Sequence, residues 1–246
     1  MSRLQLGSTR SFQDWRREKT TPTILVVGNT GTGKSALING MIGENVAAEA
    51  LEKGTTRVRA YIHPDSGIRF WDTPGLHDGG IGEDVKNISN MKSEGCADAD
   101  IVFYCVKMTV RFQQEDQETI KNLTEGLGKR IWKNVVIVLT FANDVVAHLN
   151  RQHKRRPGKK SVHHIFKDLV KGWKKALVDA VESAGVDSEI AKCIPVIPAG
   201  YAIEKLFPND DDNWVESLWY TKRGAEMKEP SAYSDVQASI LSGMFA

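Results

Sequence analysis

Residues 28–35 have the types and the spacing of a turn that binds a polyphosphate. Four residues separate Gly28 from Gly33, and Lys34 and Ser35 follow at once. Glycines let the backbone aim several N–H groups at one anion, Lys34 can bridge the β and γ oxygens, and the Ser35 hydroxyl can ligate Mg²⁺. The residues expected to contact the nucleotide phosphates are Asn29, Thr30, Gly31, Thr32, Gly33, Lys34 and Ser35.

The place of this turn in the chain distinguishes it from an accidental glycine-rich loop. It follows an apolar run at residues 23–27, and a helical pattern begins at Ser35. A strand, a glycine-rich turn and a helix in this order bring the positive end of the helix to the phosphates. The context therefore favours a nucleotide phosphate site.

A second candidate element is Asp72-Thr73-Pro74-Gly75, directly after an expected strand that ends at Trp71. An aspartate at a strand end beside a phosphate-binding turn can hold Mg²⁺ through water. The Gly75 N–H can bond a γ-phosphate and lose that bond on hydrolysis, which reorders the residues that follow. The alternative is an ordinary turn, because aspartate, proline and glycine are all common in turns.

Two adjacent threonines lie between these elements, at the entry to a predicted hairpin. A threonine in this place can ligate Mg²⁺ and bond the γ-phosphate through its backbone, which makes it part of a mobile switch. We predict that Thr56 has this role, with Thr55 as the near alternative. Both residues can also be simply β-branched residues that open a strand.

Together these elements resemble the TRAFAC class of GTPases, and within it most closely the AIG1/IMAP-type G domains, which are relatives of the septins and of chloroplast import GTPases. Val110-Arg111-Phe112-Gln113-Gln114-Glu115-Asp116 is similar to the Gly-Arg-Tyr/Phe-Thr-x-Glu-Asp segment of that type. Val110 replaces the glycine and Gln113 the threonine. The resemblance covers roughly residues 22–205, and it implies GTP and GDP as ligands, Mg²⁺ as the metal, GTP hydrolysis and a nucleotide-dependent homodimer.

In this class the guanine base is read by residues at the end of the fifth strand. The resemblance places Thr140 and Asp144 there, with Asp144 accepting hydrogen bonds from the base. Ala142 replaces the lysine whose stem covers the ring, and Phe141 can supply an apolar surface instead. Asp144 can also be merely a helix-capping residue. A backbone N–H after the last strand, at Ala199, is the second expected base contact.

The position that carries a water-orienting glutamine in Ras-like enzymes is Leu76, which cannot orient water. Catalysis is therefore assigned to Lys34 and to two further candidates. His77 can orient water or donate to the γ-phosphate, or it is a solvated loop histidine. Arg111 can reach across a dimer to the transferring phosphoryl group, as the resemblance implies, or it is an exposed arginine of little consequence.

Residues 151–160 carry six positive charges in ten residues. Such a run can contact anionic lipid or nucleic acid, but more often it is a solvated loop, and no aromatic residue interrupts it. We therefore expect no nucleic-acid partner. Contact with a membrane surface stays an alternative.

Several short apolar runs look like the strands that position these residues. Residues 101–106 and 135–139 are apolar on both faces, and 194–197 is expected at an edge because of its proline. Residues 57–62 and 68–71 predict an antiparallel hairpin with Val58, Ala60 and Ile62 on one face. Helical spacing follows at 120–127 and 165–181. These features predict an α/β P-loop NTPase fold, a three-layer sandwich around a mostly parallel six-stranded sheet with one antiparallel strand.

The 246 residues fit one α/β domain with extensions, which we place at residues 1–20, 21–220 and 221–246. Phe12 and Trp15 suggest a short helix in the first extension. The net charge of +2, three scattered cysteines, no secretory signal and no run of about 20 apolar residues indicate a cytoplasmic protein without a transmembrane segment.

Two other functions remain open. A GTP-dependent scaffold or assembly module with negligible hydrolysis is compatible with Leu76. An ATP-using enzyme such as a small kinase is disfavoured by the Asp72 to Gly75 element and by the lack of an obvious lid segment.

Overall fold

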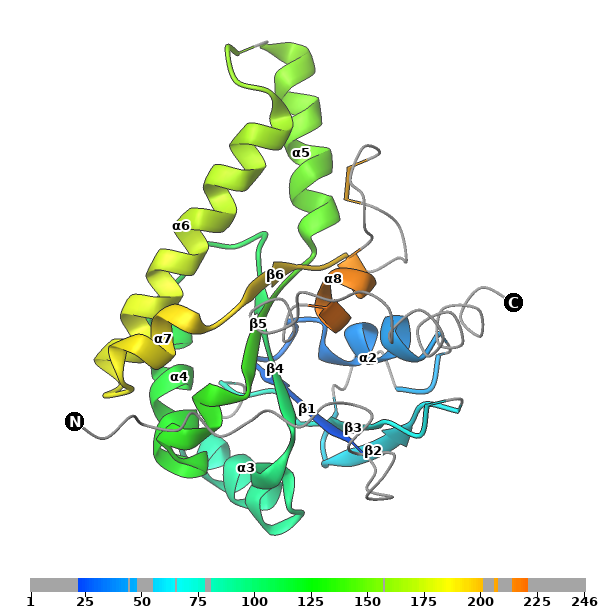
Figure 1. Cartoon of the computed structure of the whole chain (residues 1–246), viewed down its shortest axis with the longest axis vertical. Coiled ribbons are helices and arrows are strands. Elements are labelled where there is room, and N and C mark those ends of the chain that lie inside the picture. The colour runs from blue at the N-terminus through cyan, green and yellow to red at the C-terminus, as the bar shows by residue number, and fades with distance from the viewer. Residues whose placement is uncertain are drawn as a thin grey trace, which may run out of the picture.

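The computed structural model of the chain describes residues 22–43, 45–47, 55–64, 66–77, 81–156, 158–200, 206–207 and 214–220. Both predicted extensions, including the short helix around Phe12 and Trp15, lie outside these residues. The division of the chain into a G domain and two extensions therefore stays a prediction. Figure 1 shows the arrangement of the described elements.

A single six-stranded sheet forms the centre of the molecule, with the strand order β2-β3-β1-β4-β5-β6. The β2–β3 pair is antiparallel, and the other four pairs are parallel. This arrangement confirms the predicted fold class, including the edge position of the proline-containing strand. The strands are β1 Thr23–Gly28, β2 Arg59–Ile62, β3 Arg69–Asp72, β4 Ile101–Lys107, β5 Val135–Thr140 and β6 Val196–Pro198.

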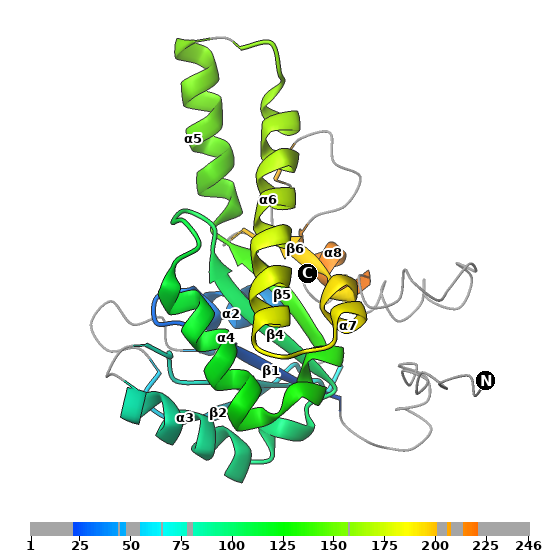
Figure 2. The same cartoon turned by 90° about the vertical axis from the view of Figure 1, so that its left-hand side faces the viewer.

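Helices cover both faces of the sheet and form the two outer layers of a three-layer sandwich (Figures 1 and 2). On one face the buried side chains of α3, α4, α6 and α7 meet the sheet, and on the other those of α2 and α8 do so. The helices are α2 Lys34–Ile42, α3 Ile81–Ser93, α4 Gln114–Leu127, α5 Ala142–Arg155, α6 Val162–Ser183, α7 Ser188–Cys193 and α8 Trp214–Tyr220, with short 3₁₀ turns η1 Cys96–Asp98 and η2 Lys129–Lys133.

Alternate residues of the central strands enter the two cores. In β1, Leu25 and Val27 face the α3/α4/α6 side, whereas Ile24 and Val26 face the α2/α8 side. Side chains of a strand alternate between faces, so a strand covered on both sides must be apolar throughout. This requirement explains why these strands were recognisable as continuous apolar runs.

The predicted alternation along residues 58–62 agrees with the structure, because Val58 packs against the α3/α4/α6-side core and Tyr61 against the opposite one, but most of the face shared by Val58, Ala60 and Ile62 is not buried. Tyr61 packs against the α2-side core, whereas Ala60 is exposed and Ile62 is 58% exposed. Tyr61 pairs directly with the fully buried Phe70 of β3, so the two rings lie on the same face of the sheet. Cross-strand pairing with a large aromatic residue thus decides which face of this edge strand is buried.

Helix α8 was not predicted from the sequence. Trp214, Val215 and Leu218 are buried and join the core formed with α2. The Trp214 ring lies so close to α2 that a Cβ added at Gly40 would be 3.1 Å from its Cη2 atom. The helical spacing of these apolar residues could have predicted this helix from the sequence.

Helices α5 and α6 form an antiparallel hairpin that extends beyond the edge of the sheet (Figure 2). The basic segment 151–160 lies at its tip, between the last turn of α5 and the start of α6. Ser161 caps α6, because its side-chain oxygen accepts the N–H of His164 at 3.2 Å. Within the described residues, no helix has both the length and the apolar character needed to cross a bilayer.

The contact between α3 and α4 gives a testable prediction. A Cβ added at Gly126 of α4 would overlap the Ile88 side chain of α3, so Gly126→Ala should lower the free energy of unfolding by about 1–3 kcal/mol. The control is Gly172→Ala in α6, where an added Cβ has no atom of the described residues within 4 Å. This substitution should raise the free energy of unfolding by about 0.5–1 kcal/mol. Urea denaturation measures both changes, and equal stabilisation by the two substitutions would contradict the close packing.

Candidate nucleotide and magnesium site

The phosphate-binding turn connects the end of β1 at Gly28 to the start of α2 at Lys34. Gly31 and Gly33 have φ angles of 75° and 77°, which glycine adopts without the steric cost that other residues meet. The Lys34 ammonium is 7% exposed and donates to the carbonyl oxygens of Gly28 at 3.1 Å and Asn29 at 3.0 Å. The lysine charge is thus held inside the turn, where a polyphosphate can exchange for these carbonyls.

An oxygen-rich cluster lies beside the turn, at the carboxyl end of β3. The Asp72 Oδ2 atom accepts the hydroxyls of Ser35 at 3.0 Å and of Thr55 at 2.8 Å, and these hydroxyls are 3.3 Å apart. Asp72 is fully buried, and its Oδ1 atom accepts no hydrogen bond from the described residues. A carboxylate and hydroxyls are the ligands that Mg²⁺ prefers, so this donor set fits the metal predicted there.

Burial raises the pKa of Asp72, and hydrogen bonds from Thr55 and Ser35 together with the Lys34 charge offset part of the increase. A buried carboxylate with an unsatisfied oxygen is costly because the charged form has lost its water. A bound cation would remove this cost. The electrostatics therefore favour a metal at the same place as the geometry does.

The prediction that Thr56 joins the metal cluster is not supported by the structure. Thr56 is exposed, whereas Thr55 is the threonine that reaches Asp72. In an extended segment neighbouring side chains point to opposite sides, so only one of the two can face the carboxylate. Thr55 takes the proposed ligand role.

The residues after Asp72 run alongside the phosphate-binding turn. The Leu76 N–H donates to the Gly28 carbonyl at 3.2 Å, and the Thr30 N–H donates to the Leu76 carbonyl at 2.9 Å. At Gly75 an added Cβ would lie 2.6 Å from the Thr30 Cα atom, so only glycine fits this contact. The Thr73 hydroxyl donates to the Val26 carbonyl at 2.7 Å and fixes the start of the segment. Gly75 is therefore placed directly at the turn, as its predicted switch role requires.

The side chains at positions 76 and 77 lie in different surroundings. Leu76 is fully buried in the apolar core. His77 has a φ of 64°, and its N–H donates to Asp84 at 2.7 Å. Its ring nitrogens each lie 4.0 Å from a carboxylate oxygen, one of Asp84 and one of Glu118. These contacts hold the ring against α3 and α4, and its catalytic role remains a prediction.

Asn29 connects the phosphate-binding turn to α4. Its amide nitrogen donates to Asp116 at 3.3 Å, and its oxygen accepts the Thr119 hydroxyl at 2.5 Å. Asp116 also accepts the Gln113 N–H at 2.9 Å, and burial raises the pKa of its carboxyl. The contacts of Asp116 and Thr119 with the turn were not predicted, although Asp116 belongs to the segment that resembles the AIG1/IMAP type, because only the fold brings α4 beside the turn.

Arg111 lies in the segment between β4 and α4 and is exposed. Its neighbour Phe112 packs edge-on against Trp173 of α6, with ring centres 6.1 Å apart. On the N-terminal side of Arg111, the Met108 N–H donates to the Thr140 carbonyl at 3.0 Å, and on the C-terminal side Asp116 is also tied to Asn29. The segment is thus fixed at both ends while the arginine side chain points into solvent.

The base-side residues gather where β5 meets α5. The Thr140 hydroxyl donates to the Thr32 carbonyl at 2.8 Å and lies 3.1 Å from the Val106 carbonyl, so it links the turn to two strands instead of pointing freely at a base. The Phe141 ring lies against Gly33, where an added Cβ would be 3.2 Å from Cε2. Asp144 is exposed in the first turn of α5.

Two further residues of this region were not predicted from the sequence. The Lys107 ammonium lies 5.0 Å from the centre of the Phe141 ring, so a lysine at the end of β4 supplies a cation that the Ala142 position lacks. The buried Oδ1 atom of Asn143 accepts no hydrogen bond within the described chain. The sequence could have indicated Lys107, because this residue lies at the carboxyl end of a strand.

The predicted role of Ala199 is contradicted by the hydrogen bonding of β6. The Ala199 N–H donates to the Leu139 carbonyl at 2.8 Å, and Ala199 is fully buried. Its amide is therefore engaged with the neighbouring strand and cannot also bond a base. The amide of Gly200, one residue further, becomes the candidate.

Known proteins share both the sequence pattern and the fold. Translocase of chloroplast 159 from Arabidopsis thaliana is 34% identical over 127 residues, which are 48% of this chain and 8% of that protein. GTPase Era from Aquifex aeolicus is 25% identical over 197 residues, which are 76% of this chain and 59% of that protein. This chain therefore spans less than two thirds of the length of either relative.

The fold matches solved structures over most of its length. A structure of Toc33 from Arabidopsis thaliana superposes with a TM-score of 0.65 at 22% identity, covering 85% of this chain and 86% of that one. The model of the AIG1 family matches residues 22–168, which is more than half of the 246 residues and includes the turn, Asp72 and Asp144. The predicted resemblance is thus confirmed, and the chain belongs to the AIG1 family.

Proposed function

We propose that this chain binds GTP and GDP with Mg²⁺ and hydrolyses GTP to GDP and phosphate. The observation that carries the proposal is the Ser35–Thr55–Asp72 cluster, in which a buried carboxylate keeps one oxygen without a hydrogen-bond partner among the described residues. The cluster lies next to a lysine held inside a glycine-rich turn. A metal-bound nucleotide triphosphate meets all of these requirements at once.

Relatives support this function. One relative is named as a GTPase, and Toc33 has been solved with GDP and Mg²⁺ and with GMPPNP and Mg²⁺. Dimerisation is described as important for the GTPase activity of Toc33 and Toc159. We extend guanine-nucleotide binding and dimerisation to this chain as part of the proposal. A cytoplasmic location also remains a prediction.

The residues of the proposed site have different roles, which depend on where each of them lies. The Lys34 ammonium exchanges the Gly28 and Asn29 carbonyls for phosphate oxygens, which neutralises charge on the transferring group. Ser35, Thr55 and Asp72 would hold Mg²⁺, and the metal would offset the negative charge of the phosphates. Gly75 lies against Thr30 and is placed to respond to the γ-phosphate.

Arg111 is proposed as a residue that acts across a dimer. It is exposed and makes no hydrogen bond or ion pair with the described chain, while both flanks of its segment are fixed. A guanidinium supplied by a second copy stabilises charge that develops in the transition state. Leu76, the residue after Gly75, is buried and apolar and cannot orient water, so a cationic group from a second copy can supply catalysis that this position lacks.

A second function is favoured by the same leucine. If no partner supplies a catalytic group, the chain holds GTP without appreciable hydrolysis and presents a GTP-dependent surface for assembly. Light scattering with GTP and with a slowly hydrolysed analogue separates the two functions. Assembly that persists with GTP and releases no phosphate supports the scaffold.

Replacement of the buried carboxylate tests the metal site. Because the folded-state pKa of Asp72 is raised, the nucleotide-free protein loses stability as the pH rises from the ordinary aspartate pKa through the folded one. Asp72→Asn should therefore be at least as stable as the parent at neutral pH without nucleotide. With Mg²⁺ and GDP at about 100 times Kd, the parent gains about 5–10 °C in melting temperature and the variant gains almost none. A full gain in the variant would contradict the assignment.

The adjacent threonines give a matched pair of substitutions. Thr55→Ala removes a hydroxyl that bonds Asp72, so the Mg²⁺ concentration needed for half-maximal GTP hydrolysis should rise on the order of 10–100-fold. Thr56→Ala removes an exposed hydroxyl and should leave it unchanged. A Mg²⁺ titration of phosphate release measures both. The reverse order of effects would restore Thr56 as the ligand.

The dimer proposal predicts that turnover depends on protein concentration. Specific activity should rise with concentration in the parent, and Arg111→Ala should remove the rise and lower the plateau on the order of 10³-fold. The control is Arg130→Ala, which removes another exposed arginine and should behave as the parent. Constant specific activity over a wide dilution series would exclude the dimer contribution while leaving nucleotide binding intact.

A further inference from the structure

The charges of the chain are separated into two regions of opposite sign. Residues 151–175 contain ten Lys and Arg residues and one Asp, which is a net charge of +9. The whole chain has a net charge of only +2, so the remaining residues carry a net charge of −7. This asymmetry coincides with one structural unit, the tip of the α5–α6 hairpin and the first half of α6. We call this unit the basic hairpin.

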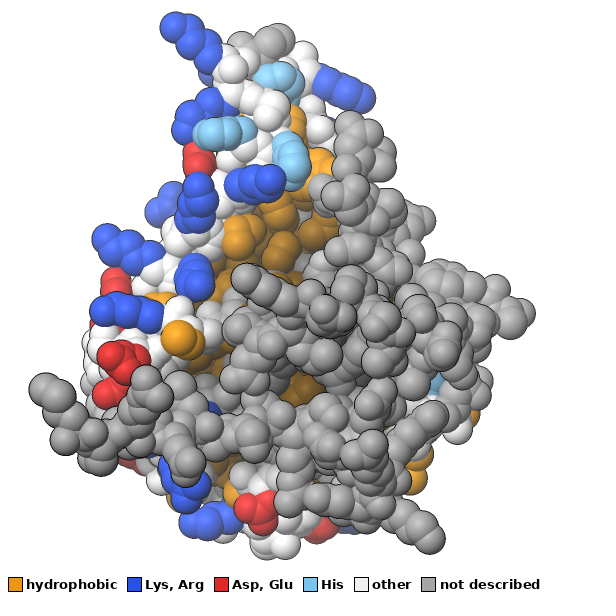
Figure 3. All heavy atoms as spheres, viewed as in Figure 1, with side chains coloured by type: hydrophobic (Ala, Val, Ile, Leu, Met, Phe, Trp, Pro, Cys, Tyr) orange, Lys and Arg blue, Asp and Glu red, His pale blue; other side chains and the backbone are white. Residues whose placement is uncertain are grey.

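The positive side chains of the basic hairpin occupy its tip and one outer row. Figure 3 shows Lys and Arg side chains gathered at the tip and along α6. The row on α6 consists of exposed lysines that each follow a residue directed toward the protein interior, so it lies about 100° around the helix from the buried row. These lysines are Lys167, Lys171 and Lys174.

Little of this charge is neutralised by the residues that the structure describes. In the described chain, Lys160 pairs with Asp168 at 2.7 Å, and the other Lys and Arg residues of the basic hairpin form no ion pair. Exposed like charges so close together repel one another and lower stability. An external anionic surface is the partner that relieves this repulsion.

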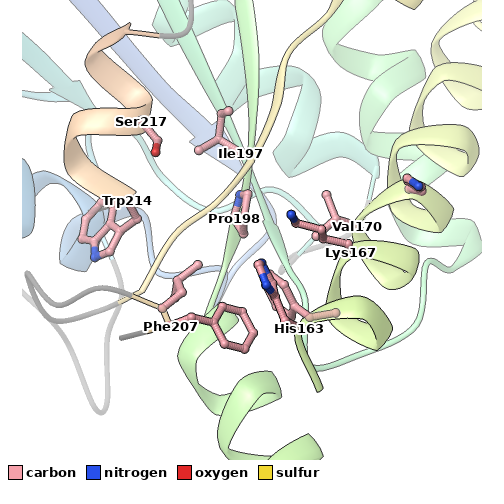
Figure 4. Close-up of a pocket in the computed structure, with 11 residues that line it drawn as sticks. His163, Lys167, Val170, Ile197, Pro198, Phe207, Trp214 and Ser217 are labelled. Atoms are coloured by element: carbon pink, nitrogen blue, oxygen red, sulfur yellow. The ribbon is translucent and has the colours of Figure 1, made fainter. Parts of the chain in front are cut away.

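An apolar cavity of about 410 Å³ opens beside the lysine row. Phe166 and Val170 of α6 line it together with Phe207, and Lys167 and Lys171 also border it (Figure 4). Figure 3 shows the hydrophobic side chains in a hollow next to the basic ones. An apolar hollow with cations at its border matches an amphiphile that has an anionic head and a hydrocarbon chain.

We propose that the basic hairpin docks this protein on an anionic lipid bilayer. The tip and the lysine row bind headgroup phosphates and carboxylates, and the cavity accepts part of an acyl chain. The net negative charge of the remaining residues is repelled by the same surface, which orients the molecule with the hairpin toward the lipid.

The residue types favour lipid over nucleic acid. The row on α6 is built from lysines, which act as point charges, and not from arginines, whose planar forks suit phosphates and bases of nucleic acids. The aromatic rings of α6 are also engaged inside the protein, Trp173 with Phe112 and Phe166 with Phe207. They are therefore not available to stack on bases.

The test is sedimentation of the full chain with phosphatidylcholine vesicles, with and without phosphatidylserine. The parent should bind only the anionic vesicles, and rising salt should weaken the binding. The variant Lys167→Gln/Lys171→Gln/Lys174→Gln should bind on the order of 100-fold more weakly, since each lysine near the surface contributes about five-fold. Its GTP turnover should equal that of the parent, and its melting temperature should be equal or slightly higher because part of the charge repulsion is removed.

The matched control is Lys86→Gln/Lys92→Gln/Lys121→Gln, which removes three exposed lysines from α3 and α4 and changes the net charge equally. It should bind anionic vesicles as the parent does. Equal weakening by both triple variants, equal binding to neutral vesicles, or displacement of the protein from anionic vesicles by duplex nucleic acid at equal phosphate concentration would each overturn the proposal. None of these outcomes bears on GTP hydrolysis measured in solution.

Discussion

The arrangement around the nucleotide site depends on one buried carboxylate. Asp72 lies at the end of a strand, has no exposure to solvent, and accepts hydroxyls from the phosphate-binding turn and from the segment that precedes β2. A charge in such surroundings is unfavourable by itself, and hydrogen bonds from two hydroxyls and the nearby Lys34 charge compensate part of the cost. The hydrogen bonds of Ser35 and Thr55 to this one carboxylate therefore hold three separate parts of the chain together.

The turn is also fixed from two other directions by polar side chains. Thr140 joins it to the ends of β4 and β5, and Asn29 joins it to α4 through Thr119 and Asp116. Leu76 adds two backbone hydrogen bonds from the segment after β3. Each of these segments is thus joined to the phosphate-binding turn by direct hydrogen bonds. Asp116 of α4 accepts hydrogen bonds from both Asn29 of the turn and Gln113, the last residue of the segment that carries Arg111, so one carboxylate contacts both.

The sequence alone predicted the features that depend on residues close together in the chain. The turn at residues 28–35 and Asp72 follow from the order of residues along a strand and its end, and the parallel strands follow from their continuous apolar character. The sequence did not predict contacts between residues that are distant from each other in the chain. Thr55 and Asp72 are 17 positions apart, and only the fold decides which of two adjacent threonines meets the carboxylate. The bonds from Thr119 to Asn29 and from Thr140 to Thr32 span 90 and 108 positions. Ala199 was misassigned because the register of β6 determines which amide is already used.

The α5–α6 hairpin has a consequence for how two copies of the protein meet. Helix α5 has 14 residues and is therefore about 21 Å long, and it begins directly beside Phe141 and Asp144. If the proposed docking holds the hairpin tip on a bilayer, the nucleotide-binding edge would lie at a distance from the surface that is set by the length of α5. Encounters between copies then take place within a plane, where a small number of molecules reaches a high local density. In the proposed lipid-bound state, the hairpin would act as a spacer, and copies of the protein would meet by diffusion over a surface instead of through a volume.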